Sequence, residues 1–226
     1  MRVGVLGTGI VGRTLSVKLI ELGHEVIMGT RDVNALLSRQ EPPPWGESFP
    51  DWRARNPDVP LGTFAEAAAH AELVFHATAG VVCLEALNAA GKSNLDGKIL
   101  IDVANPLDFS QGFPPFLSVV NTDSLGEQIQ GAFPGARVVK TLNTVSADVM
   151  VAPQLVGGGD HHAFVSGNDA KAKEEVTSIL RDWFGWTNVL DLGDITTARG
   201  TEMLMALWVR LLGVKGNGMF NLKVVT

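Results

Sequence analysis

A glycine-rich turn between a strand pattern and a helix pattern constrains the fold of this chain more than any other feature. Residues 2–6 form a short extended apolar run, glycines follow at positions 7, 9 and 12, and apolar residues then recur at helical spacing as far as residue 20. Gly23 ends the predicted helix, and residues 25–28 form a second strand pattern. A strand, a helix and a strand this close together predict a parallel sheet with a right-handed crossover.

The turn itself has the spacing of a dinucleotide-binding fingerprint. It reads GxGxxG, in which the first glycine permits the tight turn, the second lets the backbone approach a pyrophosphate, and the third packs the helix on the strand. The N–H groups at the start of the helix then face the anion. The predicted binding residues are Gly7, Thr8, Gly9, Ile10, Val11 and Gly12.

The end of the second strand distinguishes the two nicotinamide dinucleotides. An acidic residue there holds the ribose hydroxyl of NAD, whereas an arginine accommodates the 2′-phosphate of NADP. Thr30 and Arg31 offer a hydroxyl and a guanidinium group, which suit a phosphate. Asp32 is the competing NAD-type residue, but we interpret it as the cap of a short helix over residues 33–39. The sequence therefore favours NADP.

The remaining elements predict an α/β fold, a doubly wound parallel sheet of the Rossmann type with a small C-terminal α/β portion. We expect a dinucleotide-binding domain over residues 1–145 and a smaller substrate-side domain over residues 146–226. The predicted strands are 73–77, 98–103, 137–142, 163–166 and 188–192. The predicted helices are 63–71, 81–90, 124–132, 169–183 and 196–212, the first of them with a capping box of Thr63 and Glu66.

A proline-rich stretch over residues 41–60 interrupts this pattern. Its prolines argue against a long regular element, so we expect an ordered loop that carries Trp45, Phe49 and Trp52. Two roles stay open for these aromatic residues: packing on the surface of the domain, or forming a lid over a ligand.

Composition excludes several classes of protein. The chain has a net charge of −6, which argues against a nucleic-acid or anionic-membrane surface, and 46% of its residues are hydrophobic, which excludes a disordered chain. Its one cysteine, Cys83, cannot form an internal disulfide and fits a reducing cytoplasm. The chain shows neither a signal-peptide pattern nor an apolar run of transmembrane length, so we expect a cytoplasmic protein without a membrane partner.

No residue pattern indicates a catalytic nucleophile or a metal site. The adjacent pair His161 and His162 point in different directions and lack further ligands at metal-binding spacing, and no GxSxG motif occurs. We interpret His76 as a structural histidine at a strand end rather than a catalytic one. An apolar stripe on the last helix, which includes Leu207 and Leu211, is either core or a dimer contact.

Four segments together resemble the NADP-dependent oxidoreductases of the 8-hydroxy-5-deazaflavin coenzyme F420. They are residues 1–32, 101–107 (IDVANPL), 137–144 (RVVKTLNT) and 164–169 (FVSGND). The last two are also similar to the cytosolic reductase domain of the Steap metalloreductases, which moves hydride from NADPH to a flavin. The resemblance covers nearly the whole chain, and residues 41–60 are the main departure.

This resemblance implies further binding positions and a reaction. Ala77 and Thr78 match backbone that lines the ribose and nicotinamide path, while Ala104, Asn105 and Thr141 match positions that flank the nicotinamide. The family implies hydride transfer between NADP(H) and coenzyme F420 or a flavin bound in an interdomain cleft, and it implies a homodimer. Stacked planar rings need proximity rather than an acid or a nucleophile, so no catalytic residue is predicted.

Three other functions compete with this one. The first is an NADP(H)-binding regulatory protein without turnover, favoured if the loop of residues 45–52 fills the acceptor cleft. The second is an NADPH-dependent ferric or flavin reductase. The third is a reductase of an imine, which we consider less favoured because such enzymes carry a long helical C-terminal domain. The expected partner in each catalytic case is a small-molecule hydride acceptor.

Overall fold

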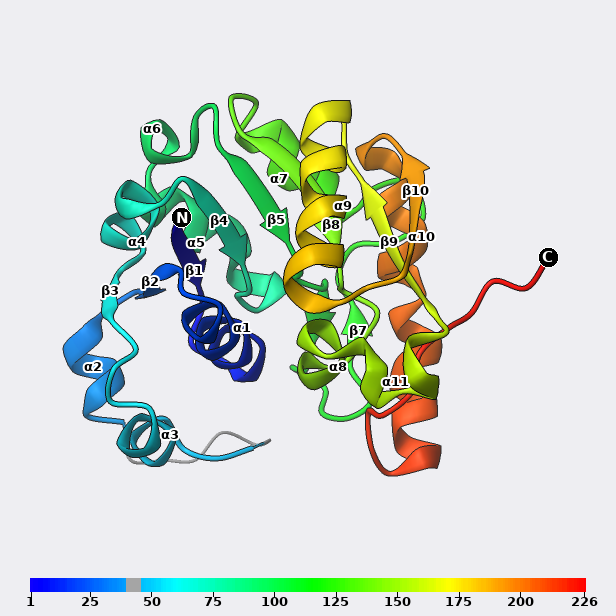
Figure 1. The fold of residues 1–226 in the computed structure, drawn as a ribbon, viewed down its shortest axis with the longest axis horizontal. Coiled ribbons are helices and arrows are strands. Elements are labelled where there is room, and N and C mark those ends of the chain that lie inside the picture. Colours follow the sequence, from blue (N-terminus) through cyan, green and yellow to red (C-terminus); the bar gives the residue numbers. More distant parts are fainter. Residues whose placement is uncertain (40–45) are drawn as a thin grey trace.

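A computed structural model describes residues 1–39 and 46–226 and places most strands in one sheet (Figure 1). Within the described residues the large sheet has eight strands in the order β10-β9-β8-β5-β4-β1-β2-β3, and β6 and β7 form a separate antiparallel pair. The strands are β1 Arg2–Leu6, β2 Glu25–Thr30, β3 Leu61–Thr63, β4 Leu73–His76, β5 Ile99–Asp102, β6 Leu107–Asp108, β7 Phe116–Leu117, β8 Arg137–Thr141, β9 His162–Ser166 and β10 Asn188–Gly193.

The helices connect these strands and cover both faces of the sheet. The α-helices are α1 Ile10–Glu21, α2 Val33–Leu37, α3 Phe49–Arg55, α4 Phe64–His70, α5 Cys83–Ala90, α6 Lys92–Leu95, α7 Leu125–Ala132, α8 Ala147–Val151, α9 Ala170–Phe184, α10 Ala198–Met203 and α11 Met205–Lys215. Short 3-10 turns η1 Gly80–Val82, η2 Pro153–Leu155, η3 Gly157–Gly159 and η4 Ile195–Thr197 lie between them. The α/β class and the doubly wound arrangement are confirmed.

Successive side chains of the central strands supply two cores. In β4, Phe75 belongs to the cluster formed with α1, α8 and α9, whereas its neighbour Val74 belongs to the cluster formed with α4, α5 and α7. This alternation follows from the two-residue repeat of a strand whose two faces are both covered. Figure 1 shows α1, α8 and α9 together on the nearer face of the sheet.

The sheet is parallel from β3 to β8, and one pairing departs from the expectation. β9 runs antiparallel to β8, with Lys140 opposite Ser166, and β10 then pairs parallel to β9. The sheet therefore continues across residue 145, where we expected a domain boundary. The division into residues 1–145 and 146–226 stays a prediction.

The proline-rich stretch is more regular than we expected. It contains the helix α3, which begins after Ser48, whose Oγ accepts a hydrogen bond from the N–H of Asp51. Pro50 lies in the first turn, where a helix needs no N–H donor, so this proline favours the start of a helix instead of preventing one. Phe49 and Trp52 are buried against Leu36 and belong to a third cluster, and Trp45 lies outside the described residues.

The expected long helix of residues 196–212 is also different. It divides at Leu204 into α10 and α11, and a 3-10-type hydrogen bond from Leu207 N to Leu204 O accompanies the break. Within the described residues no helix is long and apolar enough to span a membrane.

Candidate functional site

The three glycines of the fingerprint differ in whether packing requires them. Gly7 has a φ of 124° and a side chain on it would collide with the carbonyl group of Ala77, while a side chain on Gly12 would collide with the carbonyl of Gly7. Both glycines are thus required by the packing of the turn itself. Gly9 has an ordinary φ of −73°, and a Cβ there would meet no described atom within 4 Å. Packing therefore does not require a glycine at position 9, and the space above it is open to a ligand.

The N-terminus of α1 next to Gly9 has the properties of an anion site. Gly9 is its N-cap, no side chain caps the helix, and its first turn contains no acidic residue. The first N–H groups of such a helix have no partner inside the helix, and its dipole favours negative charge. Ile10 is 46% exposed at this end, so a ligand can reach the turn from solvent.

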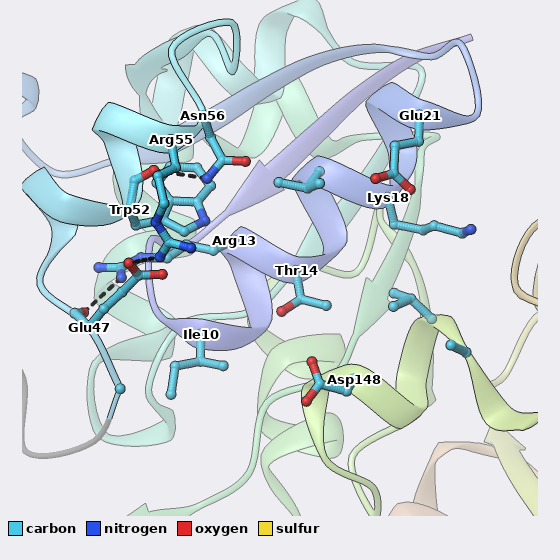
Figure 2. Close-up of a pocket in the computed structure, with 14 residues that line it drawn as sticks. Ile10, Arg13, Thr14, Lys18, Glu21, Glu47, Trp52, Arg55, Asn56 and Asp148 are labelled. Atoms are coloured by element: carbon cyan, nitrogen blue, oxygen red, sulfur yellow. Dashed lines mark hydrogen bonds and ion pairs between the residues drawn. The ribbon is translucent and has the colours of Figure 1, made fainter. Parts of the chain in front are cut away.

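Arg13, which sequence reasoning missed, holds this turn against α3 (Figure 2). Its Nε donates to the carbonyl of Thr8 at 2.8 Å, and its Nη1 donates to the carbonyl of Glu47 at 3.0 Å. The guanidinium lies 5.1 Å from the ring centre of Phe49, and burial lowers its pKa. One sequence feature could have identified Arg13: it is a cation in the first turn of a helix, where the helix dipole disfavours positive charge unless a specific partner is present.

The end of β2 presents the two predicted phosphate-binding residues. Thr30 is buried at the end of the strand, and the side chain of Arg31 is 66% exposed and lies 3.0 Å from the carboxylate of Glu85. Asp32 accepts a hydrogen bond from Ala35 N at 2.9 Å and caps α2, which confirms our interpretation of this aspartate. The Arg31 guanidinium is therefore available to an anion that displaces one exposed carboxylate.

A cavity of about 430 Å³ lies beyond the ends of β4 and β5 and brings together several predicted residues. Its size is that of a small-ligand site, and its position is the one at which parallel sheets bind ligands. Its polar lining includes Thr78 and Asn105, and its apolar lining includes Phe109. The predicted residues that line it are Val11, Ala77, Thr78, Ala104 and Asn105.

Asn143 lies outside the cavity lining and holds one of its residues in place. Asn105 donates to the carbonyl of Asn143 at 2.7 Å, and Asn143 donates back to Asn105 Oδ1 at 2.9 Å and to the carbonyl of Thr201. Asn143 thus fixes the predicted Asn105 against α10. Thr141, also predicted, is 1% exposed and is not part of the cavity lining.

A buried ionic network lies directly behind the cavity. Lys140 Nζ lies 2.7 Å from Asp102 Oδ2 and 2.8 Å from Glu202 Oε1, and each of the three side chains is at most 1% exposed. Glu202 also accepts hydrogen bonds from the N–H groups of Leu125 and Gly126 at the start of α7. His76 joins the network through Asp102 at 2.8 Å.

Charge pairing overcomes burial in this network. Burial alone would raise the pKa of Asp102, but Lys140 and then His76 outweigh it and hold that pKa at about 2. Burial alone would lower the pKa of Lys140, but Asp102 and Glu202 raise it above its ordinary value. Asp102 and Lys140 are therefore both charged at neutral pH.

A second hollow, of about 560 Å³, runs along α1 between α3 and α8 (Figure 2). Both basic and acidic side chains line it, among them Lys18, Arg55 and Asp148. Of the predicted residues only Ile10 borders it. Its lining follows α1 away from the strand ends, so it is not the cavity that the fingerprint predicts.

Metal-ligating residues do not gather within the described part of the chain: no group of three or more His, Cys, Asp or Glu side chains is placed to hold an ion. His161 is buried and its Nε2 lies 2.9 Å from the carbonyl of Pro153. Cys83 is a buried free thiol, and burial raises its pKa to about 12.

A family model, a solved structure and a curated relative all indicate the same family. Residues 2–106 match the family model described as NADP oxidoreductase coenzyme F420-dependent. The crystal structure of a candidate F420-dependent NADP reductase from Arthrobacter sp. FB24 is 57% identical, covers 100% of both chains and superposes with a TM-score of 0.94.

Two more distant relatives are similar over almost the whole chain. The F420-dependent NADP reductase of Methanothermobacter marburgensis is 26% identical over 93% of this chain and 92% of its own length. The rat metalloreductase STEAP3 is 29% identical over 93% of this chain, which spans 37% of that protein's length.

Proposed function

This chain belongs to the family of coenzyme F420-dependent NADP oxidoreductases, and from that membership we propose that it transfers hydride between NADP(H) and a deazaflavin or flavin acceptor. One observation carries the proposal: the open approach over Gly9 adjoins the uncapped start of α1 and the cavity that contains Thr78 and Asn105. A dinucleotide laid over that turn brings its nicotinamide to the cavity.

Different residues would bind different parts of NADP(H). Arg31 and Thr30 would bind the 2′-phosphate, the N–H groups at the start of α1 would bind the pyrophosphate, and Asn105 would orient the nicotinamide. NADPH supplies the hydride when bound. The protein contributes proximity between two planar rings.

The acceptor ring has an aromatic surface available beside the cavity. Phe109 lines the cavity and is 49% exposed. An exposed ring at a cavity mouth offers an offset-stacking partner to a planar heterocycle. We therefore place a deazaflavin or flavin ring between the nicotinamide and Phe109.

A regulatory protein without turnover is less well supported. That function is favoured if the loop of residues 45–52 fills the acceptor cleft, but Phe49 and Trp52 pack beside Arg13 and do not line the cavity. Trp45 lies outside the described residues.

The direct test is NADPH oxidation by the purified protein with coenzyme F420, FMN, FAD and a ferric chelate in parallel. We expect turnover with the deazaflavin. In Phe109→Ala the KM for the deazaflavin should rise. Phe116→Ala is the matched control, because Phe116 is also exposed but lies outside the cavity lining, and its KM should change little. Turnover with a flavin or iron alone would move the protein to the metalloreductase type. NADPH binding without turnover on any acceptor would support the regulatory function.

We also propose a cytoplasmic homodimer that is formed through α11. Leu207 is 52% exposed and Val214 is 85% exposed on this helix, so its apolar stripe is only partly covered by its own chain. Sedimentation should give twice the chain mass of 24.1 kDa, and Leu207→Glu should return it to one chain mass. A wild-type protein of single mass would refute the proposal.

A further inference from the structure

A hydroxyl group in the cavity lining is hydrogen-bonded to a buried imidazole. Thr78 lines the cavity, and its Oγ1 lies 2.6 Å from Nε2 of His76. The other ring nitrogen of His76, Nδ1, lies 2.8 Å from Oδ1 of Asp102. Hydroxyl, imidazole and carboxylate thus form a continuous hydrogen-bonded series from the cavity into the protein.

The sheet builds this series from adjacent strand ends. His76 is the last residue of β4 and Asp102 the last residue of β5, and the register places the two opposite each other. Both side chains are 0% exposed, and the partners that the described residues offer to the ring nitrogens are Asp102 and Thr78. Thr78 is therefore the link between the imidazole and the cavity.

The groups around His76 fix which of its ring nitrogens faces the cavity. Asp102 is kept ionised by Lys140, whose other side is occupied by Glu202. Cys83, the remaining titratable group that senses this network, is a neutral thiol because its pKa is about 12. An ionised carboxylate only accepts, so Nδ1 donates to Asp102, and Nε2 is the ring nitrogen that faces Thr78.

We propose that Thr78 delivers the proton consumed in each reduction of the acceptor, with His76 and Asp102 as its proton relay. Reduction of a deazaflavin or flavin by NADPH takes a hydride at a ring carbon or nitrogen and a proton at a second ring nitrogen. The Thr78 O–H proton passes to that nitrogen as the N–H of His76 imidazolium passes its proton to Thr78 Oγ1. The imidazole is left neutral, and solvent in the open cavity reprotonates it through Thr78. Oxidation in the reverse direction runs the same path backwards.

This relay rests on the proposed function, and it gives Thr78 and His76 different roles. Thr78 faces the reacting rings and is the catalytic residue, whereas His76 and Asp102 are positioning residues that act through it. A general acid contributes roughly 100- to 10,000-fold to a rate. Loss of the Thr78 hydroxyl should therefore slow the hydride-transfer step far more than it weakens NADPH binding.

A first experiment tests the relay without any acceptor. Ring-nitrogen NMR of the 15N-labelled protein follows His76 in wild type, Thr78→Val, Thr78→Ser and Thr187→Val, the last a matched control whose hydroxyl contacts the distant Gly159 carbonyl. We expect exchange of the His76 ring proton with solvent to slow about tenfold or more in Thr78→Val only. Unchanged exchange in Thr78→Val would overturn the relay.

A second experiment measures single-turnover reduction of the acceptor by NADPH against pH in the same four proteins. We expect Thr78→Val to slow the step about 100-fold, with an NADPH Kd within threefold of wild type, and Thr78→Ser to restore most of the rate. Full activity in Thr78→Val would refute the proposal. If wild type reduces no acceptor, the proposed function fails, and the NMR exchange alone then decides whether the relay exists.

Discussion

The two ends of the proposed cofactor cleft differ in how exposed their charged residues are and in how far apart those residues lie in the sequence. At the β2 end, Thr30 and Arg31 are consecutive residues, and Arg31 and its partner Glu85 have side chains about two-thirds exposed. At the β4–β5 end, His76, Asp102, Lys140 and Glu202 come from four separate elements and are at most 1% exposed.

This difference separates the residues that recognise the cofactor from those that stabilise the fold. An exposed ion pair is worth less than about 1 kcal/mol, so Arg31 can exchange Glu85 for a ligand phosphate at little cost. A buried charge that loses its partner costs several kcal/mol, so the inner network cannot rearrange without damage to the fold. We therefore expect substitutions at the outer end to change cofactor choice and those at the inner end to change stability first.

The largest effect should come from Lys140→Met, which leaves Asp102 and Glu202 as buried carboxylates without their cation. We expect a loss of about 3–5 kcal/mol in the free energy of unfolding, measured by urea titration. Lys18→Met, at a half-buried position of α1 that borders the second hollow, is the control and should be nearly neutral. A loss below about 1 kcal/mol in Lys140→Met would show that the network is not a support.

Gly9→Val tests the turn between the two ends. Because a Cβ at Gly9 meets no described atom, the variant should fold, with an unchanged circular dichroism spectrum, but its NADPH affinity should fall by more than about 100-fold. Gly12→Val is the informative contrast, since its side chain collides with the Gly7 carbonyl and should destabilise the fold itself. Retained binding in Gly9→Val would mean that no pyrophosphate approaches there.

Arg31→Ala should change cofactor choice at the outer end. A charge-assisted hydrogen bond to a phosphate is worth about 1.5–3 kcal/mol, so the NADPH Kd should rise roughly 10- to 150-fold while the NADH Kd hardly changes. Fluorescence titration with both nucleotides measures this. Equal weakening of the two would remove Arg31 from the 2′-phosphate site.

Acid should weaken the inner end in a defined range of pH. The folded pKa of Asp102 is about 2, below its ordinary value of 3.8, so its contribution to stability is present above pH 4 and is lost as the pH falls towards 2. That contribution is about 2 kcal/mol. The difference in unfolding free energy between wild type and Asp102→Asn should shrink over this range, and a constant difference would contradict the ionised state.

The smallest effect is expected from Glu85→Gln. Removing the exposed competitor for Arg31 should tighten NADPH binding by a factor of a few, because the pair is worth less than about 1 kcal/mol. The gain should disappear in the double variant with Arg31→Ala. A gain that persists there would show that Glu85 repels the nucleotide directly and not through Arg31.

The sequence predicted what is encoded by neighbouring residues. The glycine turn, the Asp32 cap and the Thr63–Glu66 capping box are all local signals, and the structure has a strand–turn–helix at the first and a capped helix at each of the others. The α3 helix was missed because we took Pro50 as a breaker, although a proline in the first turn is compatible with a helix.

Contacts between distant segments could not be predicted in the same way. The pairing of His76 with Asp102 depends on the register of β4 against β5, and that of Lys140 with Glu202 depends on how α10 packs behind β8. Arg13 likewise finds its partners in residues 47–52, far along the chain. We expected His76 to be a satisfied strand-end histidine, and it is hydrogen-bonded at both nitrogens, but its link to the cavity required the structure.

A crystal structure of the protein with NADP+ bound is the most direct test of this account. We predict that the 2′-phosphate lies within hydrogen-bond distance of Arg31, that the pyrophosphate lies over Gly9, and that the nicotinamide lies against Thr78 and Asn105. A nucleotide in the hollow along α1, or one whose nicotinamide lies at Arg31, would contradict the division of the cleft into an outer recognition end and an inner reaction end.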